Sequence, residues 1–286
     1  MTELRLDFHM HSTVSDGTDS PEQLLELVRK TGLEMFSVTD HDTLAGTGIM
    51  RSLIKDGDPY YVNGIEFSCR DEEGKYHILG YGYDPDGESV NGVVELAHSY
   101  RAKKAKLRVD FVVNELGIDL PKDVIEGFLK LPNPGKPHLA NILVEYGYAE
   151  SKDKAIKEIL GKFKYPSQYI RPEQAIDGIL RSGGIPVLAH PIFGSGDQLI
   201  LGSEMEERLT RLLGYGLQGV EGFYSEFTDE QRDFVLGLAE KHNLYVTAGS
   251  DYHGKNKTVR LGCNGLDKVT SFPKGLTDFV ERVSGR

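Results

Sequence analysis

The stretch that decides the fold spans residues 4–42 and reads LRLDFHMHSTVSDGTDSPEQLLELVRKTGLEMFSVTDHD. Its first residues, 4–11, have the pattern of a β-strand. A serine N-cap, a proline at the first helical position and a glutamine three residues after the cap then predict a helix over residues 22–31. The apolar run 35–39 predicts a second strand, so this segment is expected to be a strand–helix–strand unit.

The same alternation continues along much of the chain. Further strands are expected at residues 60–68, 76–83, 185–189, 219–224 and 245–249, and further helices up to residue 181, at 204–213 and at 229–241. A short charged turn at 71–74 suggests that the strands on either side of it form a hairpin or are neighbours. Strands that alternate with helices favour parallel βαβ units, and about seven of them favour an α/β barrel or a barrel-like closure.

A helical segment interrupts the alternation. Residues 90–161 are rich in lysine, arginine and glutamate, and their apolar residues recur at helical spacing. We interpret this segment as a helical insert and expect residues 1–89 and 162–286 to form the barrel domain. A length of 286 residues suits one large domain, or one domain with an insert.

Composition and charge restrict the class of protein. Hydrophobic residues make up 39% and charged residues 27% of the chain, and no apolar run is long enough to span a membrane. The net charge of −11 argues against a protein that grips long duplex nucleic acid, but allows a short nucleotide in a pocket whose positive charge comes from metal ions. With only Cys69 and Cys263, and no signal-peptide pattern before the first strand, we expect a cytoplasmic protein.

The histidines lie where the predicted strands end. Six of them do so, namely His9, His11, His41, His77, His190 and His253, and five carboxylates accompany them, namely Asp16, Asp40, Asp42, Glu66 and Asp251. In α/β barrels the carboxyl ends of the strands form the active-site face, so these side chains are expected at one rim. Each motif alone is compatible with unrelated histidines or a turn, but together they predict a metal site.

Local patterns support this prediction. His9 and His11 are two residues apart on a strand, so their rings point to the same side and can share a metal. Glu66 stands between apolar neighbours, where a carboxylate is costly to bury unless it is paired or bound to metal. A set of His, Asp and Glu ligands suits Zn²⁺, Mn²⁺ or Fe²⁺ rather than Ca²⁺, and this many ligands suit two or three ions.

With these motifs in order, the chain resembles the PHP (polymerase and histidinol phosphatase) superfamily of metal-dependent phosphoesterases over nearly its whole length. The stretches that carry the resemblance are Asp7–Ser12 with Ser15–Gly17, Thr39–Asp42, Gly64–Ser68, His77–Tyr81, Leu188–Pro191 and Gly249–His253. It looks most similar to the stand-alone nucleotide phosphoesterases, which carry a helical insert. The resemblance implies a distorted (β/α)7 barrel with a trinuclear metal site.

The resemblance also implies a ligand set. By position, the first metal would be held by His9, His11, Glu66 and Asp251; Glu66 would bridge to a second metal held by His77 and His190; and Asp16, His41 and His253 would hold the third. Histidinol phosphatases of the superfamily often have His where Asp16 stands, so this residue favours the nucleotide branch. The relatives usually have Arg where Lys136 stands.

The expected reaction is metal-assisted hydrolysis of a phosphate ester, in which the cations generate a hydroxide nucleophile and neutralise the phosphoryl oxygens. We expect Asp251 and His253 to take part in catalysis, with His253 or a metal-bound water as the proton donor to the leaving group. Candidates that bind a second phosphate are Lys136, Arg101, Arg108 and Arg171, and His138 is a candidate that faces the substrate.

The resemblance points to a small phosphorylated nucleoside as substrate. The leading expectation is a nucleoside 3′,5′-bisphosphate that loses its 3′-phosphate, and the alternative is stepwise 5′ to 3′ trimming of short oligonucleotides. A non-catalytic metal-binding scaffold is a further alternative, disfavoured because every ligand position is filled. An amidohydrolase is disfavoured because Glu66, not a lysine, occupies the bridging position.

Overall fold

A computed structural model describes residues 4–164, 168–194 and 198–285. The chain divides into two compact units, one made of Met1–Val94 and Ile170–Arg286 and the other of Glu95–Tyr169. The sequence predicts the insert at residues 90–161, so the predicted and observed bounds differ by several residues. The first boundary falls inside α3 (Glu88–Asp110), and a continuous helix gives the sequence no signal there.

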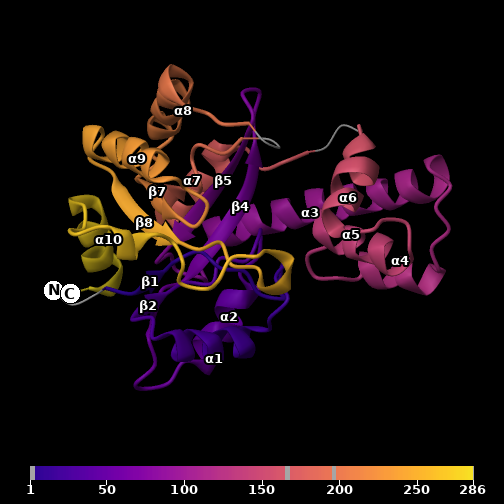
Figure 1. Cartoon of the computed structure of the whole chain (residues 1–286), viewed down its shortest axis with the longest axis horizontal. Coiled ribbons are helices and arrows are strands. Elements are labelled where there is room, and N and C mark those ends of the chain that lie inside the picture. Colours follow the sequence, from indigo (N-terminus) through magenta and orange to yellow (C-terminus); the bar gives the residue numbers. More distant parts are fainter. Residues whose placement is uncertain (1–3, 165–167, 195–197, 286) are drawn as a thin grey trace. The chain divides into compact units, whose positions relative to one another are not determined.

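The larger unit contains two β-sheets. Their strands are β1 (Leu6–Asp7), β2 (Met35–Phe36), β3 (Tyr60–Tyr61), β4 (Gly64–Arg70), β5 (Lys75–Tyr81), β6 (Ile185–Leu188), β7 (Gly219–Tyr224) and β8 (Tyr245–Gly249). The first three form a parallel sheet in the order β1-β2-β3, and the others form a mixed sheet in the order β4-β5-β6-β7-β8 (Figure 1). The fold is therefore α/β.

The (β/α)7 barrel of the sequence analysis is not confirmed. β5 pairs antiparallel with both β4 and β6, because the chain reverses in the short turn after β4, where a parallel pair would need a longer crossover. Backbone contacts do bring the two sheets together: the Phe8 amide donates to the Ala248 carbonyl at 2.8 Å, and His41 forms an isolated parallel bridge with Glu66. Among the described residues the strands form two joined sheets, and no closed barrel is detected.

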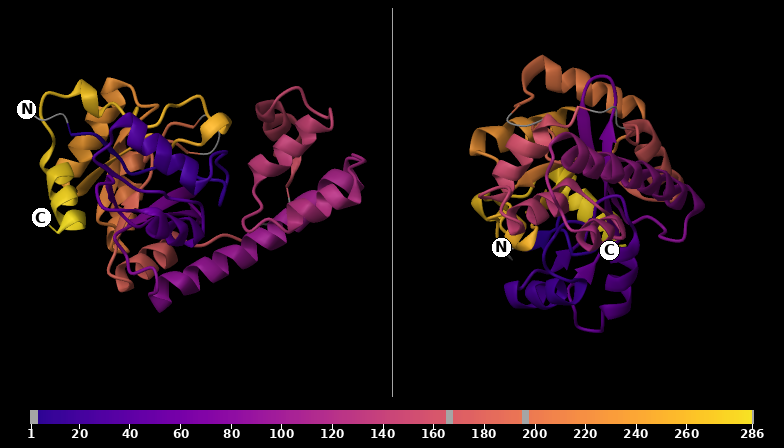
Figure 2. Two further views of the ribbon diagram at one scale, coloured as in Figure 1. Left: turned by 90° about the horizontal axis from the view of Figure 1, so that it is seen from below. Right: turned by 90° about the vertical axis from the view of Figure 1, so that its right-hand side faces the viewer.

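Helices cover these sheets. They are α1 (Pro21–Thr31), α2 (Ala45–Leu53), α7 (Pro172–Arg181), α8 (Gly202–Gly214), α9 (Asp229–Lys241) and α10 (Lys274–Ser284) (Figures 1 and 2). α1 begins as its sequence predicts, with Ser20 and Gln23 in a reciprocal capping box. On α10, Phe279 packs edge-on against Phe8 and Tyr81, with ring centroids 5.2 and 5.3 Å apart. This packing anchors β1, which leads into the first two histidines.

The smaller unit is helical. It continues α3 through a π-helical turn, η1 (Phe111–Glu115), and adds α4 (Lys122–Leu129), α5 (Lys136–Glu145), α6 (Lys152–Lys154), η2 (Ala155–Ile159) and η3 (Leu160–Lys162) (Figure 2). Its buried residues, among them Val112 and Leu143, form a hydrophobic cluster within the unit. Among the described residues of the whole chain, no helix combines the length and the apolar character that crossing a bilayer requires.

Candidate metal centre

The nine predicted ligands lie together in the larger unit. They come from the ends of strands or the loops that follow them: His9, His11 and Asp16 after β1, His41 after β2, Glu66 and His77 within β4 and β5, His190 after β6, and Asp251 and His253 after β8. Three sets of ligand atoms lie within 4.8 Å of one another, namely His11, Asp16, His41 and His253; His9, His11, Glu66 and Asp251; and His41, Glu66 and His77.

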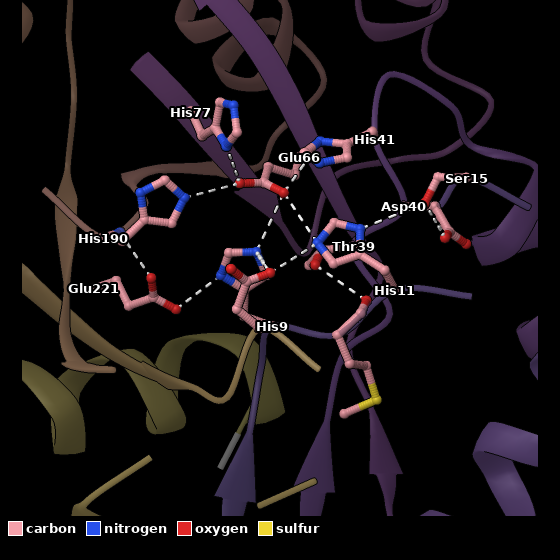
Figure 3. Close-up of polar contacts among 12 residues, drawn as sticks. His9, His11, Ser15, Thr39, Asp40, His41, Glu66, His77, His190 and Glu221 are labelled. Atoms are coloured by element: carbon pink, nitrogen blue, oxygen red, sulfur yellow. Dashed lines mark hydrogen bonds and ion pairs between the residues drawn. The ribbon is translucent and has the colours of Figure 1, made fainter. Parts of the chain in front are cut away.

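The Glu66 carboxylate lies at the centre of this cluster (Figure 3). Its Oε1 is 2.8 Å from His77 Nδ1 and 3.4 Å from His190 Nε2, whereas its Oε2 is 3.0 Å from His11 Nε2, 3.2 Å from His9 Nε2 and 3.2 Å from His41 Nδ1. The two oxygens thus face different groups of histidines. A carboxylate in this position can bridge two metal ions.

The geometry resembles the expected ligand sets but is not identical to them. The set around His9 has the same four members as the first expected metal site. In the second set His41 takes the place of His190, which still lies beside Glu66, and His11 joins the third set. His11 and His41 therefore each face two groups of ligands.

The residues present fit metal ions. Glu66 is 1% exposed, and His9 and His11 are fully buried. Both carboxylate oxygens of Glu66, Nε2 of His9 and His11, and Nδ1 of His77 are buried without a hydrogen bond among the described residues. Buried polar atoms are normally satisfied, and atoms that converge in this way fit a shared cation. Burial tends to raise the pKa of Glu66, but the charges of His41 and His77 outweigh it and hold that pKa well below its usual value.

Glu221 was not predicted from the sequence. It is fully buried in β7, where its Oε1 accepts a hydrogen bond from His9 Nδ1 at 2.9 Å and its Oε2 accepts one from the His190 amide at 2.8 Å (Figure 3). A neutral imidazole carries one N–H proton, and the first contact places that proton on Nδ1 of His9. Nε2 of His9 then has a free lone pair, which is directed at Glu66. An acidic residue inside an apolar strand is the same signal that singled out Glu66.

The Glu221→Gln variant is expected to bind metal about 10- to 100-fold more weakly, because the amide cannot fix His9 and His190 in the same way. Added metal should restore most of the activity. Metal titrations of the variant and of Glu230→Gln, an exposed change on α9, measure the effect. Affinities equal in the two variants would contradict a positioning role for Glu221.

Asp251 is held by two neighbours that the sequence analysis did not consider. Tyr224 Oη donates to its Oδ2 at 3.0 Å, and Lys257 Nζ forms an ion pair with the same oxygen. Its Oδ1 lies 3.4 Å from His9 Nε2 and 3.3 Å from His11 Nε2. One oxygen is thus anchored and the other faces the histidines.

The backbone is strained at this rim. Asp42, His190 and Asp251 have positive φ angles of 53°, 28° and 55°, in a region that residues other than glycine rarely adopt. Such conformations persist where surrounding contacts enforce them and are frequent at functional sites.

Asp40 and Asp42, which the sequence places beside the ligands, hold loops instead. Asp40 accepts hydrogen bonds from the amide and hydroxyl of Ser12 at 2.8 and 2.7 Å and from Ser15 Oγ at 2.6 Å. Asp42 accepts one from the Ser68 amide at 2.8 Å. These contacts shape the loop that carries Asp16 and the end of the strand that carries Glu66.

A cavity of about 460 Å³ opens beside the cluster. Seven of the nine predicted ligands line it: Asp16, His41, Glu66, His77, His190, Asp251 and His253. Three basic side chains that the sequence analysis did not single out also line it, namely Lys75, Arg208 and Lys257. The metal-type ligands are thus accessible to a small anionic molecule.

Comparison with known proteins agrees with this geometry. The sequence profile of the PHP domain matches residues 7–170. The chain belongs to the PHP domain family. The match begins at the strand that leads to His9 and extends through β5 and the helical unit.

Relatives of this PHP domain act on phosphate esters. The chain is 32% identical to a phosphoribosyl 1,2-cyclic phosphate 1,2-diphosphodiesterase of Eggerthella lenta, in an alignment that covers 87% of this chain and 94% of the relative. It is 28% identical to a 5′-3′ exoribonuclease of Haemophilus influenzae (93% and 96%) and 28% identical to a 3′,5′-nucleoside bisphosphate phosphatase of Chromobacterium violaceum (89% and 89%). A solved structure of a proposed metal-dependent phosphoesterase from Bifidobacterium adolescentis matches with a TM-score of 0.83, 28% identity and 98% coverage of both chains. This PHP domain is a hydrolase of phosphoester bonds.

Metal binding to this PHP domain is expected to release protons. Burial tends to lower the pKa of His11, but the nearby carboxylates of Asp251 and Glu66 outweigh it and raise the pKa to about 9 in the metal-free protein. Only the neutral ring binds metal, so below pH 9 the metal competes with this proton. Apparent affinity should rise by about tenfold per pH unit for each proton released between pH 6.5 and 8.5, and the contribution of His11 should level off above pH 9. Competition with a chromophoric chelator at each pH measures the apparent metal affinity. An affinity that does not change with pH would contradict the expectation.

The five basic and polar substrate-binding candidates lie in two places. Arg171 belongs to the larger unit, where its guanidinium pairs with Glu72 at 2.8 Å and with Glu173. These two carboxylates compensate its charge, which removes the reason to expect a phosphate there. Arg101, Arg108, Lys136 and His138 belong to the smaller unit.

Proposed function

We propose that this PHP domain hydrolyses the phosphate monoester of a small nucleotide, with a nucleoside 3′,5′-bisphosphate as the leading substrate and a nucleoside 5′-monophosphate and phosphate as products. The observation that carries the proposal is the buried Glu66 carboxylate, which five histidine nitrogens face from within 3.4 Å. The named activity of the Chromobacterium relative supports the same choice of substrate.

The nine ligands suit three divalent ions, for which Mn²⁺, Fe²⁺ and Zn²⁺ are the candidates. His9, His11, Glu66 and Asp251 would hold one ion; Glu66, His77 and His190 a second; and Asp16, His41 and His253 a third. When bound, such ions lower the pKa of water and neutralise charge on the phosphoryl oxygens. The strand ends that carry these ligands orient the ester, and the cavity beside them admits it.

His253 fits the role of a ligand better than that of a proton donor. Its Nδ1 lies 2.8 Å from the carbonyl oxygen of Asp251, which can only accept, so the proton is on Nδ1. Its Nε2, 3.3 Å from Asp16 Oδ1, then carries the free lone pair. The proton for the leaving oxygen therefore comes from a water molecule in this account.

A basic cluster in the smaller unit suits a second phosphate. A Cβ on Gly135 would lie 3.4 Å from His138 Nδ1 and 3.6 Å from Arg101 Nη1, so both side chains reach this glycine, which precedes Lys136. Burial, together with the positive charge of Arg101, lowers the pKa of Arg108 to about 10. The planar guanidinium group donates paired hydrogen bonds to phosphate oxygens, so two neighbouring arginines suit a phosphate group.

Trimming of short oligonucleotides is the second candidate, supported by the cavity beside the ligands and by the named activity of the Haemophilus relative. Both reactions break the same bond. Water oxygen bonds to phosphorus, the bond from phosphorus to the 3′-oxygen breaks, and that oxygen gains a proton.

Rates on adenosine 3′,5′-bisphosphate and on a 5′-phosphorylated dinucleotide separate the two candidates. A higher kcat/KM for the bisphosphate supports the leading proposal, and a higher value for the dinucleotide supports trimming. No hydrolysis of either, with metal demonstrably bound, would favour the non-catalytic scaffold.

A further inference from the structure

Arg208 on α8 is buried, and no carboxylate among the described residues pairs with it. It is 7% exposed and, within residues 4–164, 168–194 and 198–285, it is the only buried lysine or arginine. No described carboxylate forms an ion pair with it. A buried charge is costly unless it is paired, so an uncompensated arginine indicates a ligand that the site is built to take.

The guanidinium group of Arg208 is held in a fixed position. Its Nη2 donates to the Lys75 carbonyl at 2.8 Å, and its Cζ lies 4.3 Å from the centre of the Tyr76 ring. Arg211, one turn further along α8, differs in charge balance: its Nη2 lies 3.4 Å from Asp71 Oδ2. Arg211 is therefore compensated, whereas Arg208 retains donors that no described carboxylate occupies.

Arg208 lines the cavity that contains the metal-type ligands. It lines the same cavity as Glu66, His77 and His190. Lys75 also lines this cavity and stands two residues before His77 on β5, so the two side chains point to the same face of the strand. Lys75, Tyr76 and Arg208 form one wall of the cavity, which we call the cationic wall.

The cavity is larger than a terminal phosphate requires. At about 460 Å³ it falls in the range of pockets that hold a small organic ligand. In a nucleoside bisphosphate the scissile phosphate ends the molecule. In an oligonucleotide one of its oxygens is esterified to the next nucleoside, which carries a further phosphate of its own.

We propose that the cationic wall binds the phosphate that follows the scissile phosphate, which makes Arg208 a specificity-determining residue for oligonucleotides. This inference rests on the proposed phosphoesterase function and concerns the same site. The planar guanidinium group donates paired hydrogen bonds to phosphate oxygens, and its burial excludes the water that would weaken them.

The test compares three substrates: adenosine 3′,5′-bisphosphate, a 5′-phosphorylated dinucleotide, and a 5′-phosphorylated trinucleotide with a 3′-hydroxyl. Only the trinucleotide has a phosphate beyond the scissile one. The Arg208→Met variant keeps most of the packing against Tyr76 and removes the charge, whereas Arg208→Lys keeps the charge. Arg211→Met, which lies on the same helix and beside the same ring, is the matched control.

In Arg208→Met, kcat/KM for the first cleavage of the trinucleotide should fall at least about tenfold more than kcat/KM for the other two substrates. Arg208→Lys should retain most of the preference, and Arg211→Met should keep the wild-type ratio. Since each ratio is measured within one protein, a partly unstable variant does not disguise the result.

Equal losses on all three substrates in Arg208→Met, or the same selective loss in Arg211→Met, would overturn the inference while leaving the phosphoesterase function intact. If the wild-type protein loaded with metal cleaves none of the three, both the proposed function and this inference are wrong.

Discussion

The Glu66→Gln variant is expected to lose metal and activity together, with kcat/KM reduced by about a thousandfold or more. Glutamine has nearly the same shape but carries no charge and only one oxygen, so it cannot bridge two cations. The loss corresponds to several kcal/mol of charge stabilisation at the phosphoryl group. Metal content by mass spectrometry and rates of phosphate release measure the two effects.

A matched control lies in the same hairpin. Glu73 is exposed in the turn between β4 and β5, so Glu73→Gln should retain both metal and activity. Full activity in Glu66→Gln, or lost activity with all metal retained, would contradict the bridging role that its two groups of histidine neighbours indicate.

The Asp7→Ala variant is expected to lower the free energy of unfolding by about 3–5 kcal/mol and Tm by roughly 10 °C. Asp7 is fully buried and accepts hydrogen bonds from the His9 amide at 3.2 Å, the Ser250 amide at 2.9 Å, Ser250 Oγ at 2.6 Å and the Gly262 amide at 2.8 Å. Alanine leaves these donors without a partner. Because Ser250 directly precedes Asp251, metal affinity should fall as well.

Chemical denaturation and metal titration of Asp7→Ala measure these effects, with Asp56→Ala, an exposed change, as the control. Burial raises the pKa of Asp7 to about 6 despite the hydrogen bonds from Ser250 and Gly262. Folding therefore favours the protonated carboxyl group, and the stability that Asp7 contributes should decrease as the pH rises through about 6, so all variants are compared at the same pH. A loss below 1 kcal/mol would contradict the view that Asp7 joins the first and last strands.

Local sequence patterns could predict that the candidate ligands lie together because strand ends meet at one edge of a sheet. His9 and His11 alternate on one strand, and Glu66 is conspicuous between apolar residues, so composition and position identified them before their neighbours were known. Glu221 carries the same signal in β7, and close reading of that strand would have found it. Its contacts with His9 and His190, however, depend on the order of the strands in the sheet, which local sequence does not show.

Other features have no local signal. α2 follows Leu44, which provides no side-chain cap, and contains two glycines, and α10 follows a proline without a capping side chain, so neither was predicted. Arg208 lies among the apolar positions Met205, Leu209 and Leu212 of α8, where a charged residue looks like an interruption of the apolar face. Its place in the cavity depends on β5, which lies far away in the sequence. The charged turn at 71–74 predicted the hairpin of β4 and β5, which the structure confirms, but the antiparallel pairing of β5 with β6 has no local signal.

The most direct test of the central claim is phosphate release from adenosine 3′,5′-bisphosphate by chelator-stripped protein, measured with and without added Mn²⁺. The account predicts no release without metal, and with metal the release of one phosphate per molecule to leave AMP, with activity that saturates as up to three ions bind. Release at the same rate without metal, or no release from any phosphate ester once metal is bound, would contradict it.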